Sequence, residues 1–143
     1  MKSSKLVLTS VIAAISLAVY VLESLVPPIV PVPGVKLGLA NAVTLIALYV
    51  VGTKCALGVL LLRIFISSLL FGQPVSLMFS ISGGLLSFGV MFFLKLFMCD
   101  ENIWAISVFG AFAHNLGQIG AAIIITGQFA VAYYFLILVI SSI

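Results

Sequence analysis

Long apolar stretches with almost no charge occupy nearly the whole chain, and this pattern constrains the fold more than any other feature. Of the 143 residues, 64% are hydrophobic and only 6% are charged, whereas soluble domains are about 45–50% apolar and about 25% charged. Such a chain cannot cover a water-facing surface, so we expect lipid to surround it. At about 20 residues per crossing, its length fits about six transmembrane helices in a single domain over residues 1–143.

Glycines, prolines and the few charges mark the expected helix ends. The N-terminal apolar run resembles a signal peptide but lacks a small-residue cleavage site, so we interpret it as a retained first helix. A proline-rich segment, residues 27–38, cannot be helical because proline lacks an N–H donor. The second helix is short for a full crossing, and a tight turn at 52–54 follows it. Helices are expected at residues 5–26, 39–51, 55–71, 75–98, 103–125 and from 129 onward.

The positions of the lysines predict the orientation in the membrane, because short cytoplasmic loops carry an excess of Lys and Arg. With the N-terminus inside, Lys2, Lys5, Lys54 and Lys95 are cytoplasmic and only Lys36 is external. We therefore expect both termini to lie in the cytoplasm.

Arg63 lies near the middle of the third expected helix, about 12 Å from its outer end at 1.5 Å per residue. An ionisable group at this depth is costly and is a functional candidate by default. One interpretation is that Arg63 binds an anionic group of a ligand. The other is a buried pair with Glu23, about one turn from the outer end of the first helix. The two can coexist if a ligand competes for the pair.

His114, Asn115 and Gln118 form a second polar group, on the fifth expected helix. Residues three and four apart lie on one helix face, and Gly110 leaves room beside His114 on that face. At mid-bilayer depth these side chains should point into the protein, either to bind a ligand or only to hydrogen-bond neighbouring helices. The chain has a single histidine, so we expect no metal site.

The loop from residue 33 to residue 41 combines glycines with a cation. Gly38 permits close approach of the backbone to a ligand, and Lys36 adds a positive charge. Asn41 stands where it can cap the second helix, and a helix N-terminus beside Lys36 would favour an anion. The same residues also make ordinary turns, so an anion site and a plain loop remain equally open.

Small residues predict close helix contacts at two places. Ser10, Ala14 and Ala18 recur every four residues along the first helix, a face suited to a partner protein or to a neighbouring helix. Gly83 and Gly84 in the fourth helix either kink it or admit a neighbour's backbone.

Several functions are excluded by what the sequence lacks. Its three acidic residues form no cluster that would hold Mg²⁺ on a diphosphate, and no Gly-rich nucleotide-binding loop is present. The basic residues are scattered, which argues against nucleic-acid binding. We therefore expect neither an enzyme nor a cofactor.

The run from Pro33 to Asn41 (PGVKLGLAN), with Arg63, the segment 82–84 (SGG) and the segment 114–118 (HNLGQ), resembles the Gx transporter family, also labelled heptaprenyl diphosphate synthase component I. That family is similar in size and hydropathy to the S components of energy-coupling factor (ECF) transporters. This resemblance implies an S-component-like helical bundle in the cell membrane of a prokaryote. It also implies a ligand under the first loop, and docking of Ala14 and Ala18 on a scaffold subunit that works with ATPases.

Three functions remain open from the sequence. The leading hypothesis is a substrate-binding subunit for a small anionic or vitamin-like solute, with Glu23, Lys36, Gly38, Asn41, Arg63, His114, Asn115 and Gln118 at the site. The alternative is a non-catalytic membrane accessory of isoprenoid, quinone or flavin redox metabolism. The third is a structural bundle in which the polar residues only join helices.

Overall fold

The computed structural model describes residues 3–25, 39–71, 74–98 and 100–128, and within these ranges all regular secondary structure is helical. The expected all-helical fold is confirmed, and five expected helices lie within about two residues of their predicted bounds. The sixth, from residue 129, lies outside the described residues. The elements are α1 (Ser3–Leu25), α2 (Ala40–Val50), α3 (Thr53–Phe71), α4 (Pro74–Phe97), the 3-10 helix η1 (Asp100–Asn102) and α5 (Ile103–Thr126).

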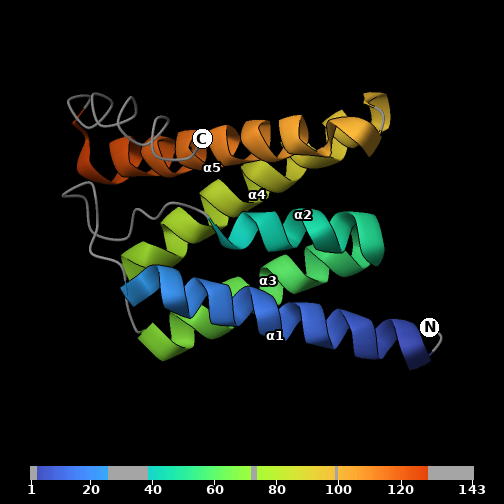
Figure 1. Cartoon of the computed structure of the whole chain (residues 1–143). Coiled ribbons are helices and arrows are strands. Elements are labelled where there is room, and N and C mark those ends of the chain that lie inside the picture. Colours follow the sequence, from blue (N-terminus) through green and yellow to red (C-terminus); the bar gives the residue numbers. More distant parts are fainter. Residues whose placement is uncertain (1–2, 26–38, 72–73, 99, 129–143) are drawn as a thin grey trace.

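The helices run back and forth along one common direction (Figure 1). Helices α1, α3 and α5 run one way, and α2 and α4 run the other way. The start of α1, the α2–α3 turn and the α4–α5 connection therefore share one end of the bundle. Lys5, Lys54 and Lys95, which the excess of Lys and Arg in cytoplasmic loops led us to expect in the cytoplasm, lie near that end as well.

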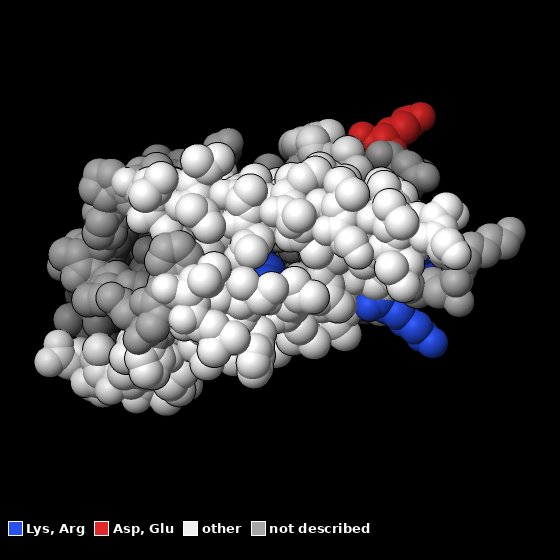
Figure 2. All heavy atoms as spheres, turned by 90° about the horizontal axis from the view of Figure 1, so that it is seen from below, with Lys and Arg blue, Asp and Glu red and all other residues white. Residues whose placement is uncertain are grey.

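The surface of the bundle is apolar, as expected for a multi-pass membrane protein. Four of the described helices, α1, α3, α4 and α5, are long and apolar enough to cross a bilayer. Large hydrophobic side chains face outward along them, with exposed fractions of 73% for Leu69, 69% for Trp104 and 82% for Ile124. In Figure 2 most of the visible surface is uncharged, and the charged side chains gather mainly at one end. Lipid is the solvent that such a surface requires.

Helix α2 occupies the interior of the bundle and contacts α1, α3, α4 and α5. It has only 11 residues, so the expectation of a short second helix is confirmed. Ala47 and Leu48 are completely buried. At its C-terminal end, Lys95 of α4 donates a hydrogen bond of 2.8 Å to the Leu48 carbonyl and lies 4.4 Å from the centre of the Tyr49 ring. A cation is favourable at a helix C-terminus, so this contact holds α2 against α4.

Two details at the helix ends differ from the expectations. The turn expected at residues 52–54 is shorter, because Thr53 and Lys54 already belong to α3. Gly52 alone reverses the chain, with a φ of 85° that favours glycine. Pro74, one residue before the expected start of the fourth helix, is itself the first residue of α4. Proline suits the first position of a helix, where its missing N–H group has no partner to lose.

Candidate ligand-binding site

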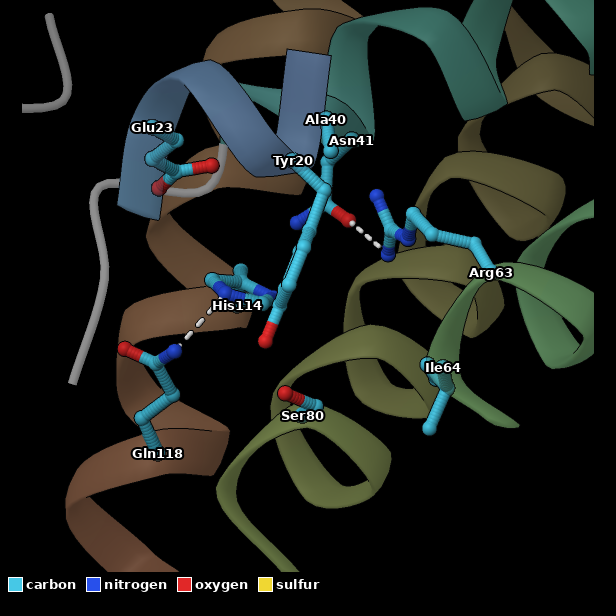
Figure 3. A pocket seen from close by; sticks show the side chains of 9 residues that line it. All are labelled: Tyr20, Glu23, Ala40, Asn41, Arg63, Ile64, Ser80, His114 and Gln118. Atoms are coloured by element: carbon cyan, nitrogen blue, oxygen red, sulfur yellow. Dashed lines mark hydrogen bonds between the residues drawn. The ribbon is translucent and has the colours of Figure 1, made fainter. Parts of the chain in front are cut away.

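A small cavity lies between the five α-helices of the described residues, and polar side chains line much of it (Figure 3). Helix α1 contributes Tyr20 and Glu23, α2 contributes Ala40 and Asn41, and α3 contributes Arg63 and Ile64. Ser80 comes from α4, and His114 and Gln118 come from α5. The cavity measures about 20 Å³, which is room for about one water molecule. The short α2 is what allows so many helices to meet here, because it begins beside the cavity.

Arg63 and Asn41 are joined directly across the cavity wall. Arg63 Nη2 donates a hydrogen bond of 3.2 Å to Asn41 Oδ1, and both side chains are 4% exposed. The expectation that Asn41 caps α2 is wrong. Leu39 occupies the N-cap position without a side-chain cap bond, and Asn41 lies inside the first turn with its amide turned to Arg63. Arg63 Nε and Asn41 Nδ2 have no hydrogen-bond partner among the described residues.

Helix α1 presents Tyr20 and Glu23 to the same cavity. Residues three apart share a helix face, so one face of α1 carries both. Glu23 is 5% exposed and Tyr20 is 7% exposed. In Figure 3, Tyr20 lies between Glu23 on one side and Arg63 on the other. The carboxylate and the guanidinium therefore border one cavity from different helices.

His114 and Gln118 form the α5 side of the cavity. Their Nε2 atoms lie 3.0 Å apart. The amide nitrogen of Gln118 can only donate, so this hydrogen bond requires the tautomer of His114 in which Nε2 is unprotonated and accepts. Both side chains are buried, at 5% and 1% exposed. The expectation that these two residues share an inward-facing side of the helix is confirmed. Their bond fixes the orientation of the imidazole ring.

Glycines bring α4 and α5 into close contact behind His114. A Cβ atom on Gly83 would lie 2.8 Å from the His114 carbonyl oxygen, and one on Gly117 would lie 2.7 Å from the Ser82 carbonyl oxygen. Backbones meet this closely only at small residues. The expectation that the Gly83–Gly84 pair admits a neighbour's backbone is therefore confirmed, and α4 continues through it without interruption. The space expected beside Gly110 is filled by Met91 and Ser87 of α4.

The structure brings five of the expected site residues to this cavity, namely Glu23, Asn41, Arg63, His114 and Gln118. Asn115 is completely buried but does not line the cavity. Lys36 and Gly38 lie outside the described residues. Ala14 and Ala18 lie elsewhere, exposed on the outer surface of α1.

Sequence reasoning missed four lining residues, Tyr20, Ala40, Ile64 and Ser80. Tyr20 could have been predicted from the sequence, because it lies three residues before Glu23 on the same helix face. Ser80 carried no signal of its own, since serines recur along α4. Within the described residues, no three side chains of His, Cys, Asp or Glu gather closely enough to hold a metal ion. The chemistry that this cavity offers is therefore hydrogen bonding and charge.

Comparison with known proteins identifies the family. A family model described as heptaprenyl diphosphate synthase component I matches residues 12–143. The chain belongs to this family. Membership in the heptaprenyl diphosphate synthase component I family confirms the resemblance drawn from the sequence motifs, while the likeness to ECF S components stays a prediction. No curated protein and no solved structure matches the chain.

Proposed function

We propose that this protein is the substrate-binding subunit of a membrane transporter, similar to an ECF S component, for a small anionic or vitamin-like solute. The observation that carries the proposal is Arg63, a buried cation at mid-helix depth that lines a small cavity together with several other polar side chains. We place the protein in the plasma membrane of a prokaryote, as a multi-pass protein with both termini inside.

The energetics of Arg63 favour an anionic ligand. A guanidinium offers five N–H donors, and its one assigned hydrogen bond goes to a neutral amide oxygen. Burying a charge without adequate partners is expensive, and more so at hydrocarbon depth. A carboxylate or phosphate group would accept hydrogen bonds from the guanidinium of Arg63, and such charge-assisted bonds are the strong ones.

The size of the cavity implies that the protein opens to admit a solute. A cavity with room for about one water molecule is too small for a vitamin-sized molecule. Because glycine contacts lock α4 to α5, we expect the opening to occur where α1 and α2 border the cavity.

The exposed face of α1 is suited to contact with a partner protein. Ser10, Ala14 and Ala18 point outward and do not pack inside the bundle. Small residues on an exposed helix face permit close approach of another membrane helix. We propose that this face contacts a scaffold subunit with ATPases, since the chain carries no nucleotide-binding loop of its own.

A second candidate function is that of a non-catalytic membrane accessory in isoprenoid, quinone or flavin redox metabolism. The family name, which describes a component of a prenyl diphosphate synthase, favours it. Its test is co-purification from the native membrane. Recovery with a prenyl transferase or a redox enzyme, and never with a coupling scaffold, would favour the accessory function over transport.

The transporter proposal is tested by native mass spectrometry of protein purified gently in detergent. We expect a small anionic molecule to remain bound to the natural protein and to be lost from Arg63→Gln. The control is Lys54→Gln, which removes one positive charge from the same helix at an exposed position and should retain the molecule. Equal retention by Arg63→Gln and the natural protein would contradict the site assignment.

A further inference from the structure

We propose that one anionic phospholipid binds to the outer surface of α1 and α3, with an acyl chain in a groove between the two helices and its phosphate group between Lys5 and Lys54. The groove measures about 290 Å³. None of its lining residues lines the Arg63 cavity, so this inference goes beyond the proposed function and does not depend on it.

Two parallel helix faces with the same residue spacing form the groove. Helices α1 and α3 run in the same direction and contact each other (Figure 1). The lining residues of each helix stand at positions i, i+3, i+4 and i+7, which is the spacing of one helix face. They are Leu6, Thr9, Ser10 and Ala13 of α1 and Cys55, Gly58, Val59 and Leu62 of α3. At 1.5 Å per residue the groove extends about 10 Å along the helices, within the depth of about 15 Å of hydrocarbon in one leaflet.

The lining of the groove offers apolar contact more than hydrogen bonding. A Cβ atom on Gly58 would meet nothing within 4 Å, so the floor is open at this glycine. The hydroxyls of Thr9 and Ser10 donate to the carbonyls of Lys5 and Leu6, at 2.8 and 3.0 Å, and their hydrogens are thus used within α1. Since an apolar cavity of about 150 Å³ holds benzene, the groove has room for about a dozen carbon atoms. An acyl chain meets these requirements of length, volume and chemistry.

The two lysines stand at the mouth of the groove. Each directly precedes the first lining residue of its helix, and both are exposed. Lys5 lies four residues before Thr9 and Lys54 four residues before Gly58, so each lysine shares a helix face with a lining residue. The Lys5 ammonium also extends toward the start of α3, because a Cβ on Gly52 would lie 4.0 Å from Lys5 Nζ. The mouth of the groove is therefore a place where two positive charges complement a phosphate group.

The acidic residues at this end of the bundle lie on another side. Asp100 and Glu101 belong to η1, which connects α4 to α5. Figure 2 shows the basic and acidic side chains of the charged end projecting from different sides of the molecule. Lysines at a membrane surface strengthen the binding of anionic headgroups by about fivefold each. An anionic phospholipid thus complements both the groove and its mouth, whereas a neutral phospholipid complements the groove alone.

The role of the lysines is tested by native mass spectrometry of the detergent-purified full chain with phosphatidylglycerol and phosphatidylcholine of identical acyl chains. We expect the natural protein to retain one phosphatidylglycerol, with at least a tenfold preference over phosphatidylcholine. Lys5→Gln and Lys54→Gln should each lower this preference about fivefold. Lys95→Met is the control, since the Lys95 ammonium binds the Leu48 carbonyl instead, and it should keep the preference. Equal retention of the two lipids by the natural protein, or an unchanged preference in both glutamine variants, would overturn the inference.

The role of the groove is tested by Gly58→Leu, whose side chain would occupy the space of the acyl chain. Because a Cβ fits at this position without contact, we expect the variant to fold and to retain at least tenfold less phosphatidylglycerol. The control Gly89→Leu adds the same side chain at an open position on α4 and should retain the lipid. Full retention in Gly58→Leu would overturn the inference. Loss of a dimer in Gly58→Leu, with lipid binding unchanged, would assign the groove to a second copy of the chain instead.

Discussion

The Arg63 guanidinium donates a hydrogen bond of 3.2 Å to the side-chain oxygen of Asn41, 22 residues earlier in the chain. This bond joins α3 to the first turn of α2 at the cavity. It leaves Arg63 with a neutral partner and unused donors, so the positive charge at the site is oriented but not neutralised by this contact.

Asn41→Asp tests this relationship while keeping Arg63. The new carboxylate would lie where the amide oxygen lies and form a charge-assisted bond with the guanidinium, which is stronger than the neutral one. We expect acetate to bind at least tenfold more weakly, with a melting temperature equal to or above that of the natural protein. Calorimetric titration and thermal unfolding in detergent measure the two effects. The control Asn102→Asp makes the same change at an exposed position and should bind normally; unchanged binding in Asn41→Asp would contradict the assigned role of Arg63.

Gly83→Ala tests the close contact of α4 with α5. The added Cβ would lie 2.8 Å from the His114 carbonyl oxygen, and since that atom is backbone, α5 must shift. We expect a loss of about 1–3 kcal/mol of stability, as for other overpacked interiors. The matched control is Gly89→Ala in the same helix, where a Cβ meets nothing within 4 Å; better helix propensity makes it neutral or stabilising by up to about 1 kcal/mol. Equal melting temperatures for the two variants would contradict the close packing.

Lys95→Met tests the attachment of α2 at its C-terminal end. Methionine keeps the apolar stem but loses the ammonium bond to the Leu48 carbonyl and the contact with the Tyr49 ring. Because Lys95 is only half-buried, we expect a loss of about 1 kcal/mol, measured by thermal unfolding. Lys54→Met, at an exposed position, is the control and should change stability by less than about 0.5 kcal/mol. A loss in the control as large as that in Lys95→Met would exclude a specific role for the Lys95 contact.

Ala14→Leu tests the proposed partner surface. Ala14 is exposed on α1, so the larger side chain should leave the stability of the isolated protein within about 0.5 kcal/mol. It should nevertheless prevent close approach of a partner helix, and we expect recovery of a coupling scaffold by affinity purification from native membranes to fall at least tenfold. Gly89→Leu adds a side chain of the same size to an open position on α4 and should leave the recovery unchanged. Full recovery with Ala14→Leu would place the partner surface elsewhere.

The positions of the helices were largely predictable from the sequence. An apolar run in lipid has few alternatives to a helix, because every backbone polar group must find its partner inside the segment. The period of the helix also placed His114 and Gln118 on one face, and their hydrogen bond confirms it. Both predictions depend on local rules that act within one segment.

The partners of the polar groups were less predictable. Asn41 was expected to cap α2 and instead bonds to Arg63, because the preference of asparagine for helix ends is a local rule that a tertiary contact overrides. Tyr20 and Ser80 were missed as lining residues. Asn115 was expected at the site, but its different direction on α5 buries it away from the cavity.

The sequence by itself determined that this chain forms apolar helices in a membrane, and that its few mid-helix polar residues must point inward. Composition and spacing settle both, since the cost of exposing a backbone amide or a guanidinium to hydrocarbon depends only on depth and chemistry. Only the tertiary structure decided that these side chains meet at one small cavity, with Asn41 beside Arg63 and Glu23 across from it. Which helices become neighbours depends on the packing of α2 inside the bundle and on the glycine contacts between α4 and α5.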